Sequence, residues 1–328
     1  MCRPLLFLCL LFSGCIFSQA QKFTFDQPKM GTECRIILWH ADSLVAAAAA
    51  AEAYHYADSL IRIFSNYLPD SEVSVINRQA GMQVVQISVH MQHLISLSLR
   101  ACQLSGGAFN PAMGPLSDLW RKARVTGQMP PAATIEQQLP LCSCNDVLLD
   151  TVAHTVLLRL KGMSLDFGGI AKGYIAQQML KVVQDRGIRH ALVDAGGDIC
   201  ASKGYEEAWR IAVNLPDQSD LTWEKSLPLS DQAVATSGDI YQHVKFGDQK
   251  FSHIIDPRTG YGVQSSRNVT VIAHDGATAD WLATACSVLS VRKAKKLAVS
   301  AGAHLLMTWM SGTKMEVVKT KHFPFGGK

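Results

Sequence analysis

The sequence predicts a mixed α+β fold, and three observations support that prediction. Helical and strand-like segments alternate irregularly, neighbouring strand-like segments are spaced as in hairpins, and no internal repeat or long linker interrupts the chain. A doubly wound parallel sheet would instead require a regular alternation of strands and crossover helices. The 328 residues, of which 48% are hydrophobic, are enough for one large domain or two ordinary ones.

The first half of the chain contains two well-marked helices. Alanine is the best helix former, so the alanine run before Tyr54 predicts a helix, and glycines commonly end helices. In order we expect a strand at 34–39, a helix from Asp42 or Ser43 to about Phe64, a helix from Ser88 to Ser105 ended by Gly106-Gly107, and a proline-rich surface segment at 129–144.

The second half alternates apolar runs with amphipathic segments. A run of β-branched and apolar residues predicts a strand, and a glycine after a periodic segment predicts the end of a helix. In order we expect a strand ending at Leu165–Asp166, a helix at 170–186 ended by Gly187, strands at 191–194, 209–215 and 268–274, a helix at about 277–289, and a helix and two short strands between 291 and 318.

The first twenty residues have the pattern of an export signal. Arg3 precedes an apolar run from Leu5 to Leu11, which is too short to span a bilayer. Ser18-Gln19-Ala20 suits ordinary signal peptidase cleavage, whereas Phe12-Ser13-Gly14-Cys15 is similar to a lipoprotein signal that would leave Cys15 lipidated. No later segment is apolar enough to cross a membrane. We therefore expect an exported protein whose folded domain covers residues 21–328.

The net charge and the cysteine content exclude few classes of function. The net charge of +4 is spread along the chain and gives no indication of nucleic-acid binding. Six cysteines lie outside the leader, and their spacing identifies no disulfide, although an exported protein can form them. Cys142 and Cys144 are the only close pair, and no Cys or His partners complete a metal site. We expect buried free thiols.

Four segments combine polar side chains with glycines, as ligand-binding loops do. They are Asp166–Gly173, Asp194–Asp198, Ala235–Asp239 continuing to His253–Gly260, and Ala279–Thr284. Glycines before a helix can bind phosphate, and Lys172 could neutralise its charge or simply be solvated. Asp194 and Asp198 flank glycines after an apolar strand, which suits either a ligand near the backbone or an ordinary turn.

Asp280 and Thr284 are four residues apart, so a helix places both oxygens on one face. A carboxylate with a hydroxyl or carbonyl oxygen suits Mg²⁺ that also binds substrate phosphates. The alternative is a helix-terminal aspartate and a threonine bonded to its own helix. Asp256-Pro-Arg-Thr-Gly260 predicts a turn, with His253 beside it as either a catalytic or a structural histidine. Together these segments indicate a phosphate-bearing ligand and a magnesium ion.

These segments belong to an ordered set of motifs that resembles the ApbE family, the FAD:protein FMN transferases. The set spans about residues 24–310 and comprises Met30-Gly-Thr32, Tyr67–Glu72 with Asn77, Gly107–Pro111 with Gly114-Pro-Leu116, Asp166–Gly173, Gly196-Gly-Asp198, Thr236-Ser-Gly238, His253–Gly260 and Ala279-Asp280 with Thr284. The elements H-x-x-D-P-R-T-G and D-x-G-x-I-A-K-G are the most specific.

The resemblance implies a T-fold-like α+β architecture with FAD in a cleft between two interlocked parts. It also implies a reaction: FAD is cleaved, AMP is released, and FMN is joined by a phosphoester bond to a Ser or Thr hydroxyl of an acceptor flavoprotein. The implied acceptors are redox-pump subunits or exported electron carriers with a D-x-[ST]-G-A-[ST]-like site, on the periplasmic side of the bacterial cytoplasmic membrane. This chain has no such site, so we do not expect it to be flavinylated itself.

The resemblance also assigns residues. The magnesium ligands are the Gly169 carbonyl, Asp280 and Thr284; relatives usually have alanine at Gly169, which a main-chain ligand should tolerate. The implied FAD contacts are Met30, Tyr67, Ala108, Phe109, Asn110, Asp166, Lys172 and the backbone near Ile254. His253 matches the catalytic histidine, and His253 or Asp256 is our candidate general base. Asn110 stands where the family usually has aspartate, which could weaken a hydrogen bond to FAD or alter the metal environment.

Other functions fit parts of the same pattern. With water in place of the acceptor hydroxyl, the site would be a metal-dependent FAD pyrophosphatase that yields FMN and AMP. A non-catalytic FAD-binding lipoprotein would not need the metal-binding pattern of Asp280 and Thr284. A purely structural exported domain would leave the concentration of glycines and carboxylates unexplained.

Overall fold

The computed structural model describes residues 19–325 except 216–217, 223–225, 239–242, 248, 265–266 and 313. Residues 1–18 of the predicted leader, including Cys15, lie outside the described residues. Within the described part of the chain, no helix combines the length and apolarity that a membrane span requires.

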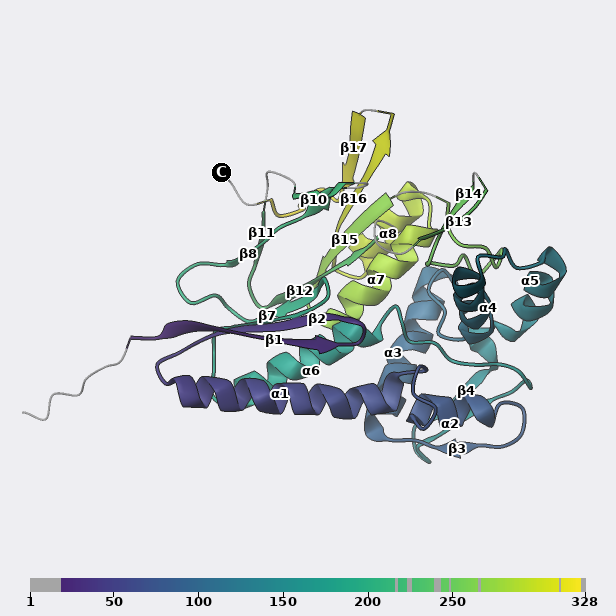
Figure 1. Cartoon of the computed structure of the whole chain (residues 1–328), viewed down its shortest axis with the longest axis horizontal. Coiled ribbons are helices and arrows are strands. Elements are labelled where there is room, and N and C mark those ends of the chain that lie inside the picture. Colours follow the sequence, from purple (N-terminus) through teal and green to yellow (C-terminus); the bar gives the residue numbers. More distant parts are fainter. Residues whose placement is uncertain are drawn as a thin grey trace, which may run out of the picture.

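An eight-stranded sheet forms the centre of the molecule, and all its pairings are antiparallel (Figure 1). Its strands, in spatial order, are β1 (Gln21–Lys29), β2 (Thr32–His40), β6 (Ala191–Ala195), β7 (Asp198–Ala201), β12 (Gln232–Ser237), β15 (Arg267–Ala273), β16 (His304–Ser311) and β17 (Lys314–Lys319). An antiparallel sheet that carries helices on one face is an α+β arrangement, so the predicted class is confirmed.

The helices pack mainly on one face of this sheet, and α1 runs alongside β1 and β2 (Figure 1). The helices are α1 (Ser43–Phe64), α2 (Glu72–Arg78), α3 (Val89–Ser105), α4 (Gly114–Thr126), α5 (Ala132–Gln138), α6 (Ala171–Asp185), α7 (Gly276–Val288) and α8 (Val291–Ser300). Successive strand residues point to opposite faces, so Val193 of β6 packs under the helices while Leu192 joins the cluster on the other face.

Shorter strands complete the structure. They are β3 (Val85–Gln86), β4 (Val147–Asp150) and β5 (Thr155–Leu158) in one small sheet, and the pairs β8 (Trp209–Ile211) with β11 (Leu227–Leu229), β9 (Asn214–Leu215) with β10 (Gln218–Thr222), and β13 (His243–Phe246) with β14 (Gln249–Ser252). A third apolar cluster, centred on buried Trp120, joins α4 and α5 to Phe251. This cluster holds the α4 region beside the main body.

The two predicted N-terminal helices are confirmed, together with their caps. Asp42 caps α1 by accepting a hydrogen bond from the backbone N–H of Leu44 at 2.7 Å. Ser88 caps α3, and Gly106 ends it with φ of 62°. Most expected elements of the second half are present with shifted ends.

Two sequence-based expectations are wrong. Leu165 and Asp166 end no strand, because the Leu165 backbone pairs with the side chain of Asn77 and the Asp166 N–H donates to Pro111 O at 2.8 Å. The run 209–215 forms two short strands with different partners. The segment 129–144 is mostly exposed or half-buried, as expected of a surface segment; it contains α5 and a helical turn at Leu139–Leu141, and a second turn, Cys144–Asp146, begins at its end.

The cysteine expectation is half right. Cys34, Cys142, Cys200 and Cys286 are free and buried. Cys102 and Cys144, in contrast, form a disulfide between residues 42 positions apart. The bond joins the end of α3 to the helical turn that precedes β4, next to the loop 106–113.

Candidate active site

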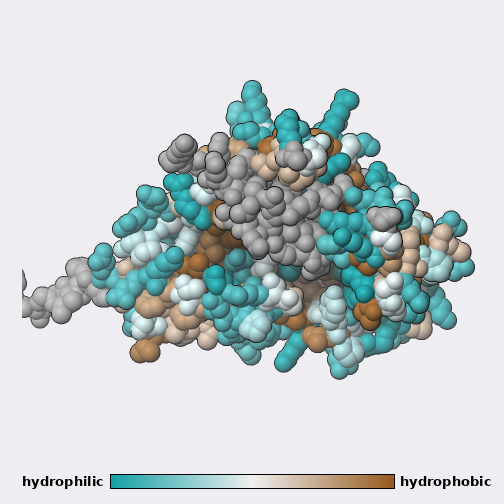
Figure 2. Space-filling model, turned by 45° about the horizontal axis from the view of Figure 1, so that its top comes forward, coloured by the Kyte–Doolittle hydropathy of each residue, from teal (hydrophilic) through white to brown (hydrophobic). Residues whose placement is uncertain are grey.

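A cavity of about 790 Å³ brings together the motif residues from distant parts of the chain. Twelve predicted site residues line it: Met30, Tyr67, Ala108, Phe109, Asn110, Asp166, Gly169, Lys172, His253, Ile254, Asp280 and Thr284. Asp256 is not among the lining residues. Figure 2 shows a mostly hydrophilic face with hydrophobic residues in small, separate patches.

The cavity's most polar corner is built where α6 and α7 cross. A Cβ on Gly173 would lie 2.1 Å from the carbonyl oxygen of Gly276, so the two helices approach this closely only because both positions are glycine. The Gly173 N–H donates to Asp280 Oδ2 at 3.1 Å. Asp280 is only 3% exposed, so its carboxylate is fixed at the start of α6 with little access to water.

Thr284 and Gly169 lie against each other beside Asp280. A Cβ on Gly169 would be 2.8 Å from Thr284 Oγ1, so an alanine here would require the threonine to move. The backbone at Gly169, the Thr284 hydroxyl and the Asp280 carboxylate form a set of hard oxygen donors, which suits Mg²⁺. Among the described residues no three His, Cys, Asp or Glu side chains form a metal site, so water or ligand phosphate would have to complete the coordination.

The half-buried Lys172 and the buried Asp198 form an ion pair next to this donor set. Burial opposes the charge of Lys172, but the carboxylates of Asp198 and Asp280 outweigh it and raise the lysine pKa, so the residue is cationic. Burial and the Asp198 carboxylate raise the pKa of Asp280 to about 8, against the opposing effects of Lys172 and the Gly173 N–H. Without a cation, Asp280 therefore holds a proton below about pH 8, and a bound metal ion would take the place of that proton.

The glycine-rich turn after β6 brings Asp198 to the cavity. Gly196 and Gly197 have φ of 73° and 94°, and the Gly197 N–H donates to Asp194 Oδ1 at 2.8 Å. Asp194 is not among the residues that line the cavity. Of the two aspartates that the sequence singled out here, Asp198 is the one placed against Lys172.

The predicted turn at Asp256–Gly260 is confirmed, with Gly260 N–H donating to Asp256 O at 2.8 Å and Gly260 at φ of 77°. The Asp256 carboxylate accepts from Arg258 Nε at 2.8 Å and Nη2 at 2.6 Å. Burial favours a higher pKa for Asp256, but the hydrogen bonds and charge of Arg258 prevail and lower it. Because the Asp256 carboxylate is paired with Arg258 and does not line the cavity, His253 is the better placed candidate base.

Asn110 makes two local hydrogen bonds at the cavity wall. Its Nδ2 donates to the Cys142 carbonyl oxygen at 2.8 Å, and its Oδ1 accepts from the Ala112 N–H at 2.9 Å. An aspartate could replace the second bond but not the first, since a carboxylate has no proton to donate. The asparagine therefore links the loop 106–113 to the segment that carries Cys142.

We expect Asn110→Asp to destabilise the fold by about 1–3 kcal/mol at pH 7, because a carboxylate would face an unpaired carbonyl oxygen. Thermal unfolding of the two proteins measures this change. Asn145→Asp is the control, because Asn145 is exposed and this substitution introduces the same charge three residues from Cys142. Equal melting temperatures for the two variants would show that the Asn110–Cys142 bond contributes nothing.

One face of α4 also lines the cavity, although the sequence analysis did not select it. Its residues are Ser117, Trp120, Arg121 and Arg124. This spacing of three, four and seven residues is that of one helix face, and it follows directly on the Gly114-Pro-Leu116 motif. The spacing was thus available in the sequence.

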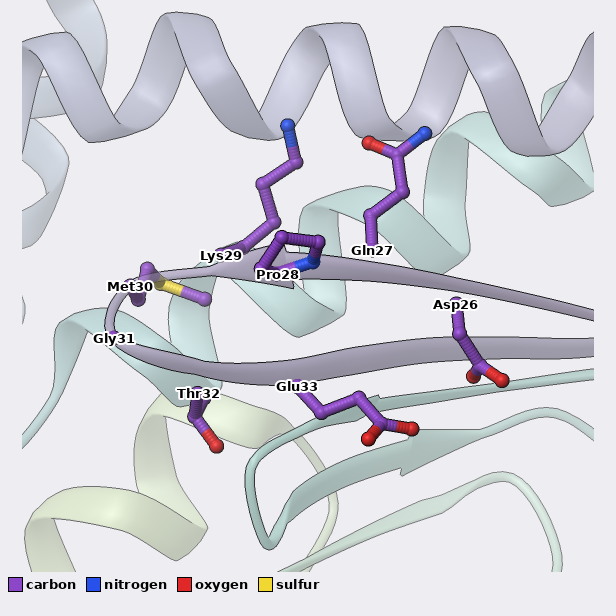
Figure 3. Close-up of a pocket in the computed structure, with 8 residues that line it drawn as sticks. All are labelled: Asp26, Gln27, Pro28, Lys29, Met30, Gly31, Thr32 and Glu33. Atoms are coloured by element: carbon purple, nitrogen blue, oxygen red, sulfur yellow. The ribbon is translucent and has the colours of Figure 1, made fainter.

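A second, shallower hollow of about 650 Å³ lies at the tip of the β1–β2 hairpin and is lined by Asp26–Glu33 (Figure 3). Met30 and Gly31 form the tip with φ of 53° and 74°, and both also line the main cavity. Lys29 points toward α1, where it pairs with Asp58 at 2.6 Å (Figure 3). That ion pair helps to hold the tip at the cavity edge.

Comparisons with known proteins agree with this arrangement. The sequence profile of the ApbE family matches residues 30–307. The chain is 30% identical to a FAD:protein FMN transferase from Klebsiella pneumoniae (strain 342), covering 84% of this chain and 85% of the relative. It is 29% identical to the FAD:protein FMN transferase of Treponema pallidum (strain Nichols), covering 80% and 78%.

Solved structures show the same likeness. The ApbE protein of Thermotoga maritima superimposes with a TM-score of 0.82 at 29% identity, covering 92% of this chain and 98% of that one. The flavin transferase ApbE of Vibrio cholerae also gives a TM-score of 0.82, at 25% identity, with 93% and 98% covered. Both the sequence profile and the fold thus extend over nearly all of the described chain, and we conclude that this protein is an enzyme, a transferase, that belongs to the ApbE family.

Proposed function

We propose that this enzyme transfers FMN from FAD to a Ser or Thr hydroxyl of an acceptor flavoprotein and releases AMP, with Mg²⁺ bound at Gly169, Asp280 and Thr284. The observation that supports this most is the single cavity in which those oxygen donors meet Lys172, His253 and the exposed ring of Tyr67. A volume of about 790 Å³ is in the range of pockets that hold a cofactor-sized ligand.

The chemistry is a displacement at phosphorus. The acceptor oxygen bonds to the FMN phosphorus of FAD, the bond from that phosphorus to the bridging oxygen breaks, and AMP leaves with the bridging oxygen. When bound, Mg²⁺ would neutralise charge on the phosphate oxygens. Lys172 adds a positive charge beside the same oxygens, and Asp198 holds its ammonium group in place.

The acceptor hydroxyl must lose its proton during the attack. We assign this role to an imidazole nitrogen of His253, which lies on the segment between β14 and the turn at Asp256–Gly260 and lines the cavity. For the flavin we assign contacts to Met30, Tyr67, Ala108, Phe109, Asn110, Asp166 and Ile254, which surround the same space.

The acceptor we propose is a flavoprotein with a D-x-[ST]-G-A-[ST]-like site, such as a redox-pump subunit or an exported electron carrier. The leader pattern supports a location outside the cytoplasmic membrane, with or without a lipid on Cys15. The Cys102–Cys144 disulfide also supports export, because such bonds persist mainly in oxidising compartments.

The decisive test is incubation with FAD and Mg²⁺, with and without an acceptor domain that carries this site. Mass spectrometry would detect FMN on the acceptor, and chromatography would quantify AMP. We expect FMN attachment and stoichiometric AMP only when acceptor is present. Equal release of FMN and AMP without acceptor would identify a pyrophosphatase instead, and bound FAD without turnover would leave a binding protein.

Metal affinity should rise with pH, because a cation must displace the proton that Asp280 holds. With a pKa of about 8, Asp280 is largely protonated at pH 6.5. If Mg²⁺ binding releases this one proton, the Mg²⁺ affinity should fall about tenfold for each pH unit below the pKa. Calorimetric titration of Mg²⁺ at pH 6, 7, 8 and 9 would measure this. An affinity that does not change over this range would contradict the assignment of Asp280.

A further inference from the structure

Arg121 of α4 covers one face of the Tyr67 ring at the rim of the cavity. Its guanidinium carbon lies 4.5 Å from the ring centroid, within the range of a cation–π contact. Tyr67 is 72% exposed and lies in the connection between α1 and α2. An exposed aromatic ring covered on one face only has its other face available to a ligand.

The position of the guanidinium is set by two carboxylates. Its Nη1 donates to Asp118 Oδ1 at 2.6 Å, one turn earlier on α4, and its Nη2 is 3.8 Å from Asp166 Oδ2. Asp166 is itself fixed, because its Oδ1 accepts from the Gly168 N–H at 2.8 Å. Within the described residues, the buried Nε of Arg121 has no hydrogen-bond partner. The guanidinium thus lies over the Tyr67 ring even though its Nε has no hydrogen-bond acceptor there.

Apart from Arg121, the described residues hold the Tyr67 side chain only weakly. No described residue forms a hydrogen bond with its hydroxyl, and its backbone N–H donates only to Ser65 Oγ, at 3.3 Å. An exposed side chain with this freedom would lose conformational entropy when it stacks on a ligand. A cation fixed against one face removes part of that cost before the ligand arrives.

We propose that Arg121 is a positioning residue for FAD: it holds the Tyr67 ring at the cavity rim so that the uncovered face stacks on an aromatic ring of the dinucleotide. This inference rests on the proposed function, since it takes FAD as the ligand. Arg121 would act through Tyr67 and not on the reacting phosphorus, whose place we assign to the corner formed by Lys172 and Asp280. Its loss should therefore weaken FAD binding and leave the chemical step intact.

The test is a double-mutant cycle on FAD affinity, measured by flavin fluorescence in the full-length protein without acceptor. We expect Arg121→Ala to raise the Kd for FAD about fivefold to tenfold, the size of a partly desolvated cation–π contact. In a separate assay with acceptor and saturating FAD, the kcat of FMN transfer should stay within about twofold of the wild-type value. In a Tyr67→Ala background, Arg121→Ala should cause no further loss, because its effect passes through the ring.

Matched variants separate this role from a structural one. Asp118→Asn weakens the carboxylate that holds the guanidinium and should reproduce part of the Arg121→Ala loss. Lys122→Ala removes an exposed cation from the adjacent position of α4 and should leave FAD affinity unchanged. Melting temperatures would show that the Arg121 variant is folded.

Two results would overturn the inference. An unchanged or lower Kd in Arg121→Ala would mean that the guanidinium only covers the ring while the cavity is empty. Additive losses in the double variant would mean that Arg121 contacts FAD directly. The proposed function is tested separately: if the wild-type protein neither binds FAD nor transfers FMN, that function fails, whereas an active wild type matched by Arg121→Ala refutes this inference alone.

Discussion

Asp280→Asn should abolish FMN transfer and at the same time make the metal-free protein more stable. The carboxylate is buried next to Asp198, and both burial and that neighbour disfavour its charge. The neutral amide avoids this cost but is a poor magnesium ligand. We expect transfer to fall by about a thousandfold, the order of magnitude of charge neutralisation at a transferring phosphate, and the melting temperature to rise by a few degrees.

The pH dependence of that stability gain follows from the raised pKa. An unfolded aspartate has a pKa of about 3.9, so the folded protein holds the proton more tightly than the unfolded chain does. This contribution to stability is fully present below pH 4 and is lost as pH rises through about 8. Asp280→Asn should therefore gain most at pH 9 and nothing at pH 4.

Thermal unfolding at several pH values, with chelator present, would measure this gain, and the acceptor assay would measure transfer. Asp185→Asn is a suitable control, since among the described residues that exposed side chain pairs only with Lys181 on the same helix. A variant that loses both stability and activity would indicate that Asp280 is a structural residue. A variant that keeps transfer would remove Asp280 from the metal site.

Local signals predicted the parts of the fold that local interactions determine. Asp42, Ser88 and Gly106 each satisfy backbone groups within one helical turn, so they mark the ends of α1 and α3 in the sequence itself. Leu165 is the opposite case: its backbone partner, Asn77, is 88 residues away and pairs through a side chain. An apolar run alone cannot distinguish that situation from a strand.

The site shows the same division. Asp280 and Thr284 share a helix face, and their four-residue spacing indicates it. The proximity of Lys172 to Asp198 and of Arg121 to Tyr67 depends on how separate elements pack, which no local spacing records. The ordered motifs identified the cavity residues only through their resemblance to a family. They did not show that Asp256 is engaged by Arg258, because the motif is identical whichever way that carboxylate points.

Loss of the Cys102–Cys144 disulfide should cause a large loss of stability. The bond closes a loop between residues 42 apart, which corresponds to about 4 kcal/mol of unfolding free energy in the chain-entropy estimate. It also acts on the site, because the cavity residues Ala108, Phe109 and Asn110 lie six to eight residues after Cys102 and Asn110 bonds to Cys142. Both ends of the segment that carries these residues are thus tied to the same part of the chain.

We therefore expect Cys102→Ser with Cys144→Ser to lower unfolding free energy by about 4 kcal/mol and to weaken FAD binding. Denaturant unfolding and flavin fluorescence would measure the two effects. Dithiothreitol should shift the wild-type protein to the same values and leave the double variant unchanged, because the other described cysteines are already free thiols. If dithiothreitol changed the stability of the wild-type protein and of the double variant equally, its effect would not come from the Cys102–Cys144 bond. If the wild-type protein lost stability but not FAD affinity, the disulfide would support the fold without supporting the loop that lines the cavity.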